Sequence, residues 1–298
     1  MRCLTYVVAE GRQNVRACDY LRSALGYSAR MMTALRKELG LLTVNGKPCP
    51  VVERVSSGDV LCVNLPDDRM NSVPNPSLRA PAAYEDEDVV VFDKPAGMPV
   101  HESKRHQENT LANLFAARCL QSGESSVFRA VNRLDKNTSG LVVVAKNRHI
   151  AGGLCAQVEK EYTAILCGVL PDDEGVIDAP IRRLAPETQI RVVSADGQRA
   201  VTRYRTLFRG EGYSVAQVVL ETGRTHQIRV HFSHIGFPLA GDEMYGGDLR
   251  DIPRHALHCG LVRFENTVTG QPVLVRSPVS GDMRALMERI SGAAGSDA

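Results

Sequence analysis

No C-x-x-C pair occurs in this 298-residue sequence, although it contains eight cysteines. Cysteine-rich zinc modules and small secreted disulfide scaffolds both depend on closely spaced cysteines. The scattered cysteines therefore exclude both classes, and we expect reduced thiols in a cytoplasmic protein. The apolar patch near the N-terminus is also too short for the hydrophobic region of a signal peptide.

Long apolar runs and a strong charge imbalance are missing as well. The densest apolar stretch runs from Leu141 to Ala145, whereas a membrane-spanning helix needs about 18 or more such residues. We therefore expect no membrane partner. Lysine and arginine number 36 against 34 aspartate and glutamate, which excludes a histone-like polycation but permits a local basic face. With 43% hydrophobic residues the chain can bury a substantial core.

Prolines mark a junction between two parts of the chain. Residues 64–82 contain four prolines among Asp, Asn and Ser residues, a composition typical of linkers. We therefore predict a small domain with its linker over residues 1–76, a large domain over residues 77–290 and a flexible tail over residues 291–298. The small domain is the more basic part, with ten Lys and Arg against seven Asp and Glu.

The small domain is predicted to contain short strands around two helices. The first helix is indicated by apolar residues at helical spacing, namely Val15, Cys18, Leu21 and Leu25. The second is expected to begin with Ser28 as its N-cap and to bury a stripe of Met31, Leu35 and Leu39. Asn45-Gly46 is a strong hairpin signal. Judged alone, the charges of the second helix are compatible with a simple solvated face.

Strand-type segments dominate the large domain. We expect strands over residues 89–92, 141–145, 162–170, 200–208 and 214–220, and helices over residues 225–235 and 283–290. Many strands and few helices, without strict alternation, favour an α+β fold with a mixed, largely antiparallel sheet.

A polar loop over residues 129–140 precedes the most apolar strand. Within it Asp135 lies two residues after Arg133. The surrounding Asn, Thr and Ser side chains can hydrogen-bond the loop to itself and fix the carboxylate. Judged alone, an aspartate in such a loop is most often a turn or capping residue. A rigid loop with Asp beside Arg is also how a site holds one oriented carboxylate.

A basic segment over residues 222–232 is the second candidate feature. Thr225 is expected to cap a helix on which His226 and Arg229 share one face. Such a helix is suited to contact phosphate or to pair with a carboxylate.

A metal site is the alternative interpretation of this region. The ligand-type side chains are His226, His231, His234 and Asp242. However, His226 and His231 are five positions apart and do not stack on one helical face, and no glutamate follows as a general base. We therefore expect no metal, and a metal-dependent hydrolase stays an alternative.

The small domain resembles the S-four-like RNA-binding domain, named after a small-subunit ribosomal protein. The resemblance is carried by Ser28-Ala29-Arg30, residues 42–47 and Ser57-Gly58-Asp59-Val60. It implies that the two helices and the following hairpin form an RNA surface with salt-dependent phosphate contacts. The candidate contacts that it implies are Arg30, Arg36, Lys37 and Lys47.

Motifs of the large domain occur in the order of one known family. They are Lys94-Pro95-Ala96-Gly97, Arg133-Leu134-Asp135 with Thr138-Ser139-Gly140, Lys160-Glu161-Tyr162, residues 220–231, residues 236–246 and Leu257-His258. Together they closely resemble the RluA family of pseudouridine synthases over most of residues 84–285. Asn132 departs from the family's usual histidine, and we expect it to alter the bracing of the loop or the grip on RNA.

The resemblance implies an RNA isomerase that converts uridine into its carbon-linked isomer. Because the reaction conserves all atoms, no cofactor, metal or second substrate is expected. Asp135 is the implied essential carboxylate; attack on the anomeric carbon, attack on the base and removal of a sugar proton all stay open. Arg229 is the implied basic partner that keeps it ionised. Tyr162 is implied to stack on the uracil and to help remove its carbon-5 proton, and an ordinary strand aromatic is the alternative.

A uridine within folded RNA must be extruded before the reaction. By the same resemblance Arg133 is a candidate to fill the vacated space, with a loop salt bridge as the alternative, and Arg224 and His226 are candidate RNA contacts. We expect ribosomal RNA of the large subunit as the substrate. The alternatives are a synthase acting on transfer RNA and a catalytically inert RNA-binding ribosome-assembly factor. A monomer is the default expectation.

Overall fold

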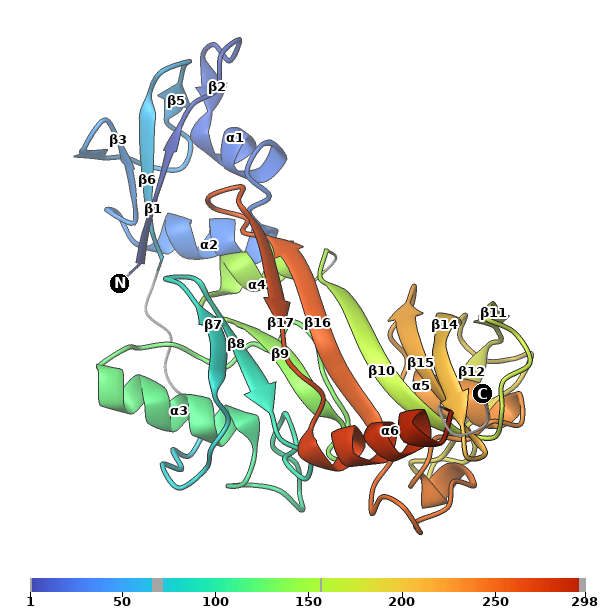
Figure 1. Ribbon diagram of the computed structural model, residues 1–298. Helices are drawn as coiled ribbons and strands as arrows, with labels where there is room; N and C mark the ends of the chain where they lie inside the picture. The colour runs from blue at the N-terminus through green and yellow to red at the C-terminus, as the bar shows by residue number, and fades with distance from the viewer. Residues whose placement is uncertain (1, 66–71, 156, 295–298) are drawn as a thin grey trace.

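The computed structural model describes residues 2–65, 72–155 and 157–294, which form two parts with separate sheets and apolar cores (Figure 1). The centre of the predicted linker, residues 66–71, lies outside the described residues. The predicted boundary at residue 76 falls between the last strand of the small sheet and the first strand of the large one.

Four strands of the small part form an antiparallel sheet in the order β1-β6-β3-β4. The elements are β1 (Arg2–Val7), β2 (Val15–Arg16), α1 (Ala17–Ser23), α2 (Ala29–Lys37), β3 (Leu42–Val44), β4 (Lys47–Pro48), β5 (Arg54–Val55) and β6 (Val60–Leu65). Asn45 and Gly46, both with positive φ, form the predicted hairpin turn between β3 and β4. The predicted N-cap is also confirmed, because the Ser28 hydroxyl oxygen accepts a hydrogen bond from the Met31 N–H at 3.2 Å.

Three apolar residues lie outside the helices that were predicted to contain them. Val15 belongs to β2, and Leu25 follows the end of α1. Leu39 is 75% exposed rather than buried. The reason is that α2 ends before it and Glu38 adopts an extended backbone, which turns the chain away from the buried stripe.

Cys3 and Cys62 form a disulfide, which corrects the expectation that all thiols are reduced. The two residues are 59 positions apart, so no local spacing signals their pairing. In the antiparallel ladder of β1 and β6, Cys62 lies opposite Thr5, which places Cys3 diagonally across on the same face. The Cα atoms are 6.4 Å apart, within the range that a disulfide spans.

The large part is built on a nine-stranded sheet in the order β11-β14-β15-β10-β16-β9-β8-β7, with β17 paired to β16. Its strands are β7 (Ala82–Glu85), β8 (Val89–Lys94), β9 (Ser139–Ala145), β10 (Glu159–Cys167), β11 (Glu174–Asp178), β14 (Val201–Gly210), β15 (Tyr213–Leu220), β16 (Leu257–Glu265) and β17 (Pro272–Arg276). Among the described residues only β9 and β16 pair in parallel. The predicted α+β fold with a mixed, largely antiparallel sheet is therefore confirmed.

Strand β9 is buried over its whole length, as its continuous apolar run predicts. It lies between β8 and β16 in the sheet. The polar loop of residues 129–138 leads directly into its N-terminal end. Gly140 permits the contact with β16: its φ is +109°, and a Cβ there would lie 2.2 Å from the carbonyl oxygen of Cys259. The glycine of the motif thus fixes how the loop meets the sheet.

Helices and a short hairpin complete the large part. They are α3 (Leu111–Ser122), α4 (Arg148–Leu154), β12 (Ile181–Arg183) with β13 (Arg191–Val193), α5 (Gln227–His234), the 3-10 turn η1 (Glu243–Tyr245) and α6 (Gly281–Ala294). Helix α6 continues through residues 291–294, which were predicted to be a flexible tail, because the buried Ile290 anchors its end against the core. Residues 295–298 lie outside the described residues. No helix in the described part of the chain is long and apolar enough to cross a membrane.

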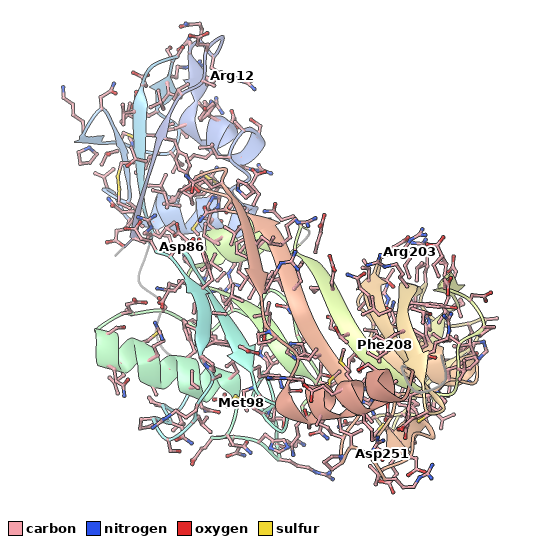
Figure 2. All side chains as sticks on the ribbon, viewed as in Figure 1. Arg12, Asp86, Met98, Arg203, Phe208 and Asp251 are labelled. Atoms are coloured by element: carbon pink, nitrogen blue, oxygen red, sulfur yellow. A yellow bond between two sulfur atoms is a disulfide. The ribbon has the colours of Figure 1, made fainter. Side chains whose placement is uncertain are left out.

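Polar and aromatic contacts join the two parts. The Arg2 guanidinium donates to both carboxylate oxygens of the buried Asp88, at 3.1 and 3.0 Å. The Tyr27 ring stacks on His149 of α4 with centroids 4.0 Å apart. Within the large part, Asp86, which lies on the side facing the small part (Figure 2), accepts a hydrogen bond from the Asn266 amide. The small part therefore has a defined orientation relative to the large sheet.

Candidate active site

A cavity of about 880 Å³ opens beside β10, the loop before β9 and the start of α5. Its walls come chiefly from residues 130–135, 157–162 and 219–229. This volume lies within the range typical of small-molecule sites. All three predicted catalytic residues line it, namely Asp135, Tyr162 and Arg229.

The Asp135 loop is fastened to the sheet by backbone contacts on both sides of the aspartate. The buried Asn132 amide donates to the Leu141 carbonyl at 3.1 Å and accepts from the Val143 N–H at 2.8 Å. Asn132, which replaces the family's usual histidine, thus braces the loop against β9. On the other side the buried Lys94 ammonium donates to the Lys136 carbonyl at 3.2 Å.

A second set of contacts supports the loop from the segment just before β16. Thr138 Oγ1 lies 2.9 Å from His255 Nε2, and Arg254 donates to the Asn137 carbonyl at 3.0 Å. Arg254 in turn pairs with Asp282 of α6 at 2.7 Å. Residues more than 100 positions away in the sequence therefore hold the loop, and no local pattern signalled them.

His255 is expected to make the folding stability depend on pH. Burial, followed by the charge of Arg229, lowers the pKa of His255 to about 3, whereas an unfolded histidine titrates near pH 6.5. Between these values only the unfolded chain binds the proton, so stability is lost as the pH falls from about 6.5 towards 3. The slope from this one group is about 1.4 kcal/mol per pH unit.

Urea unfolding at several pH values measures this effect, with His255→Gln as the comparison. Glutamine keeps a polar partner for Thr138 but does not titrate. The difference in unfolding free energy between the two proteins is expected to change steadily between pH 6.5 and pH 4. Parallel profiles would contradict the assigned role of His255.

Arg229 of α5 joins two carboxylates. Its Nη1 donates to Asp135 Oδ2 at 3.1 Å, and its Nε and Nη2 donate to the two oxygens of Asp242 at 2.7 Å each. Burial opposes its charge, but the hydrogen bonds and charge of Asp242 raise the pKa of Arg229 above its ordinary value. The guanidinium carbon of Arg229 lies over the Tyr245 ring, 4.9 Å from the ring centroid. The predicted pairing with Asp135 is present, and Asp242 is a partner that sequence reasoning treated only as a possible metal ligand.

Helix α5 begins at Gln227 rather than at the predicted Thr225, which does not cap it. His226 occupies the position before the helix with a φ of +58° and makes no side-chain cap. Instead the Gln227 side-chain oxygen accepts hydrogen bonds from the Arg224 N–H and the Thr222 hydroxyl, both at 2.9 Å. This tight turn brings His226 Nε2 to 3.7 Å from Asp135 Oδ2, so His226, although it lies before the helix and not on it, approaches the same carboxylate as Arg229.

Tyr162 lies on β10 in the wall of the cavity and is buried. Burial chiefly, together with the nearby Cys259 and Asp135, raises the pKa of Tyr162 well above its ordinary value. The phenol therefore stays protonated at neutral pH. Its position suits a ring that packs against a base, and any part in proton transfer must begin from the neutral hydroxyl.

The predicted RNA contacts fall into two groups. Arg133, Arg224 and His226 line the cavity. Arg133 is exposed and forms no ion pair within the described part of the chain, so the alternative of a loop salt bridge is not observed. The other four side chains are exposed on the small part and do not line the cavity: Arg30, Arg36, Lys37 and Lys47.

Two of the four side chains considered for a metal site, His231 and Asp242, are engaged in other contacts. His231 is buried and lies 2.9 Å from both Thr202 Oγ1 and the Ala179 carbonyl oxygen, while Asp242 is held by Arg229. No group of three or more His, Cys, Asp or Glu side chains in the described residues is arranged to hold a metal ion.

Comparisons with known proteins agree with this geometry. Residues 88–234 match the family model described as RNA pseudouridylate synthase. The uncharacterized RNA pseudouridine synthase YlyB of Bacillus subtilis is 36% identical over 97% of this chain and 99% of its own. This chain belongs to the RNA pseudouridine synthase family. Members of this family are isomerases that act on RNA, so the resemblance inferred from the motifs is confirmed.

Other pseudouridine synthases cover most of the chain. Ribosomal large subunit pseudouridine synthase D of Pseudomonas aeruginosa is 38% identical over 83% of both chains. Among solved structures, human RNA pseudouridylate synthase domain containing 4 superposes with a TM-score of 0.58 at 23% identity, covering 70% of this chain and 92% of that one. Domain containing 1 gives a TM-score of 0.56 at 24% identity, covering 72% and 95%. The human structures share the fold of about seven tenths of this chain.

Proposed function

We propose that this pseudouridine synthase isomerises uridines in ribosomal RNA of the large subunit and that Asp135 is its essential carboxylate. The observation that carries the assignment of Asp135 is its contact with Arg229. The guanidinium donates to Asp135 Oδ2 at 3.1 Å within a cavity that a nucleotide can enter. A charge-assisted hydrogen bond from a buried guanidinium holds the carboxylate in a fixed position in this cavity.

The chemistry that follows needs only groups of this chain. Asp135 acts at the junction of sugar and base, by attack on the anomeric carbon, attack on the base or removal of a sugar proton. Arg229 orients the carboxylate, because Asp242 fixes the guanidinium through Nε and Nη2 while Nη1 donates to Asp135. Tyr162 supplies a ring against the uracil and a neutral hydroxyl near the carbon-5 proton. Arg133 fills the space that the extruded nucleotide leaves.

The choice of ribosomal RNA is supported by relatives named ribosomal large subunit pseudouridine synthase D in several bacteria. Mapping pseudouridine across all RNA of a deletion strain tests it. We expect loss of a site in large-subunit ribosomal RNA, restored by the wild-type gene but not by an Asp135→Asn allele. Loss of pseudouridine confined to transfer RNA would contradict ribosomal RNA as the substrate. Restoration by the mutant allele would favour an inert assembly factor.

The small part is proposed to hold RNA through an S-four-like surface, in a cytoplasmic enzyme that acts as a monomer. Arg36 and Lys37 are exposed in the last turn of α2, and Lys47 follows the hairpin turn. Such side chains contact phosphates and release counterions when RNA binds.

Replacing both Arg36 and Lys37 with alanine is expected to weaken RNA binding and to flatten its salt dependence. Each lost phosphate contact lowers the slope of log K against log salt by about 1. Filter binding between 50 and 200 mM salt measures the slope. Arg289→Ala is the control, because its partner Asp251 lies at the end of the molecule far from the small part (Figure 2). An unchanged salt dependence in the double variant would mean that the RNA does not contact Arg36 and Lys37.

A further inference from the structure

We propose that His226 is a substrate-contacting hydrogen-bond donor whose neutral imidazole presents Nε2–H to an oxygen of the extruded uridine, and that Tyr245 is the residue that positions it. This inference rests on the proposed function. It assigns His226 a role different from a cationic phosphate contact, because a neutral ring with a fixed proton recognises an oxygen by direction rather than by charge.

The hydrogen bonds of Tyr245 define which nitrogen of His226 carries the proton. The Tyr245 hydroxyl oxygen accepts the Arg191 backbone N–H at 2.9 Å, and it lies 2.8 Å from His226 Nδ1. A hydroxyl has one hydrogen to donate, and Nδ1 is the acceptor that lies within its reach, so we assign the Tyr245 hydrogen to Nδ1. A neutral imidazole that accepts at Nδ1 carries its proton on Nε2. Burial lowers the pKa of His226; the charge of Asp135 opposes this shift and that of Arg229 adds to it, and the net lowering favours the neutral ring.

The nitrogen that carries the proton lies close to Asp135 in a residue that lines the cavity, and it has no hydrogen-bond acceptor within the described part of the chain. His226 Nε2 lies 3.7 Å from Asp135 Oδ2, beyond hydrogen-bond distance, and it donates to no other group among the described residues. The side chain is 10% exposed, and the residue lines the cavity. An oxygen of a uridine held beside the Asp135 carboxylate therefore lies within reach of this N–H.

The backbone of His226 has an unusual conformation. Its φ of +58° lies in the left-handed region, which glycine occupies freely and which, among other residues, asparagine, aspartate and histidine enter most often. A longer side chain such as glutamine is strained there. The turn therefore holds the imidazole just before α5, with Nε2 on the side of Asp135.

Three substitutions of His226 separate the donor from the backbone. Glutamine extends an amide N–H close to the position of Nε2 but is strained in this backbone conformation. Asparagine and glycine adopt the conformation readily and do not reach that position. Purified full-length variants are compared by single-turnover tritium release from a large-subunit ribosomal RNA transcript labelled with [5-³H]uridine. We expect His226→Gln to stay within about tenfold of the wild-type rate and His226→Asn and His226→Gly to lose about 10–100-fold.

Thermal unfolding of the same proteins is expected to give the reverse order, with the glycine and asparagine variants at least as stable as the glutamine variant. Added imidazole is expected to restore part of the rate of His226→Gly, and this holds even if the glutamine variant does not fold. Tyr245→Phe is expected to lower the rate of tritium release about 3–10-fold, because both tautomers of the His226 imidazole become populated.

Asparagine or glycine variants as active as glutamine, without rescue by imidazole, would overturn the inference. Asp135→Asn in the same assay distinguishes the two claims. If that variant is active, the proposed function fails; if it is inactive while all three His226 variants behave alike, only the role of His226 fails.

Discussion

Replacing Asp135 with asparagine is expected to slow pseudouridine formation by at least about a thousandfold while RNA binding stays close to that of the wild type. Asparagine has nearly the same shape, and its amide oxygen still accepts from Arg229 Nη1, which lies 3.1 Å from Oδ2 in the wild type. It can neither act as a nucleophile nor take up a proton, so every route left open for the reaction fails. Tritium release and filter binding on one RNA measure the two properties.

The control for this experiment is Asp173→Asn. Asp173 is 89% exposed and pairs with Arg209, away from the cavity. Its loss is expected to leave the rate unchanged, because an exposed pair contributes little to stability. A substantial rate in the Asp135 variant would remove the carboxylate from the mechanism. Weak RNA binding would instead indicate that Asp135 supports the surface rather than the reaction.

Replacing Arg229 with methionine is expected to destabilise the protein by about 3–5 kcal/mol and to abolish activity. The Asp242 side chain is only 1% exposed, and Arg229 supplies both of its charged hydrogen bonds. Without the guanidinium a carboxylate is buried unpaired, and Asp135 loses its cation at the same time. Urea unfolding and tritium release measure the two losses. Arg229→Lys keeps the charge but not the forked geometry, so its stability and its activity are both expected to lie between those of the wild type and of Arg229→Met.

A paired substitution separates the structural role of Arg229 from its role beside Asp135. Adding Asp242→Asn to Arg229→Met removes the unpaired charge, so most of the stability is expected to return while activity stays absent. Recovery of both properties in the double variant would show that Arg229 matters to the fold alone. A stable single variant would contradict the buried pair with Asp242.

Much of the site was predictable because its residues belong to motifs that are contiguous in the chain. Asp135, Tyr162 and Arg229 each lie in such a motif, and the structure places all three around one cavity. The spacing of His226 and Arg229 predicted one helical face, whereas His226 lies before the helix and approaches the same carboxylate from there. What the spacing does not reveal is the left-handed backbone of His226, because that conformation arises from the hydrogen bonds of Gln227 in the turn.

The remaining partners were not predictable, because each depends on an approach between distant segments. Asp242 has ligand-type chemistry, and only the packing of η1 against α5 assigns it to Arg229 instead of a metal. His255 reaches Thr138 across 117 positions, and the disulfide joins Cys3 to Cys62 across 59. No periodicity or local composition records such contacts.

The sequence by itself determined the two-part plan, the α+β class, the buried strand β9 and the family, since these follow from composition, periodicity and ordered motifs. Tertiary structure alone decided which charges meet and which proton faces the cavity. Arg229 is shared between Asp135 and Asp242, and Tyr245 orients His226. The physical reason is that hydrogen bonds act over about 3 Å, a distance that only the packing of the sheet, the loop and α5 brings about.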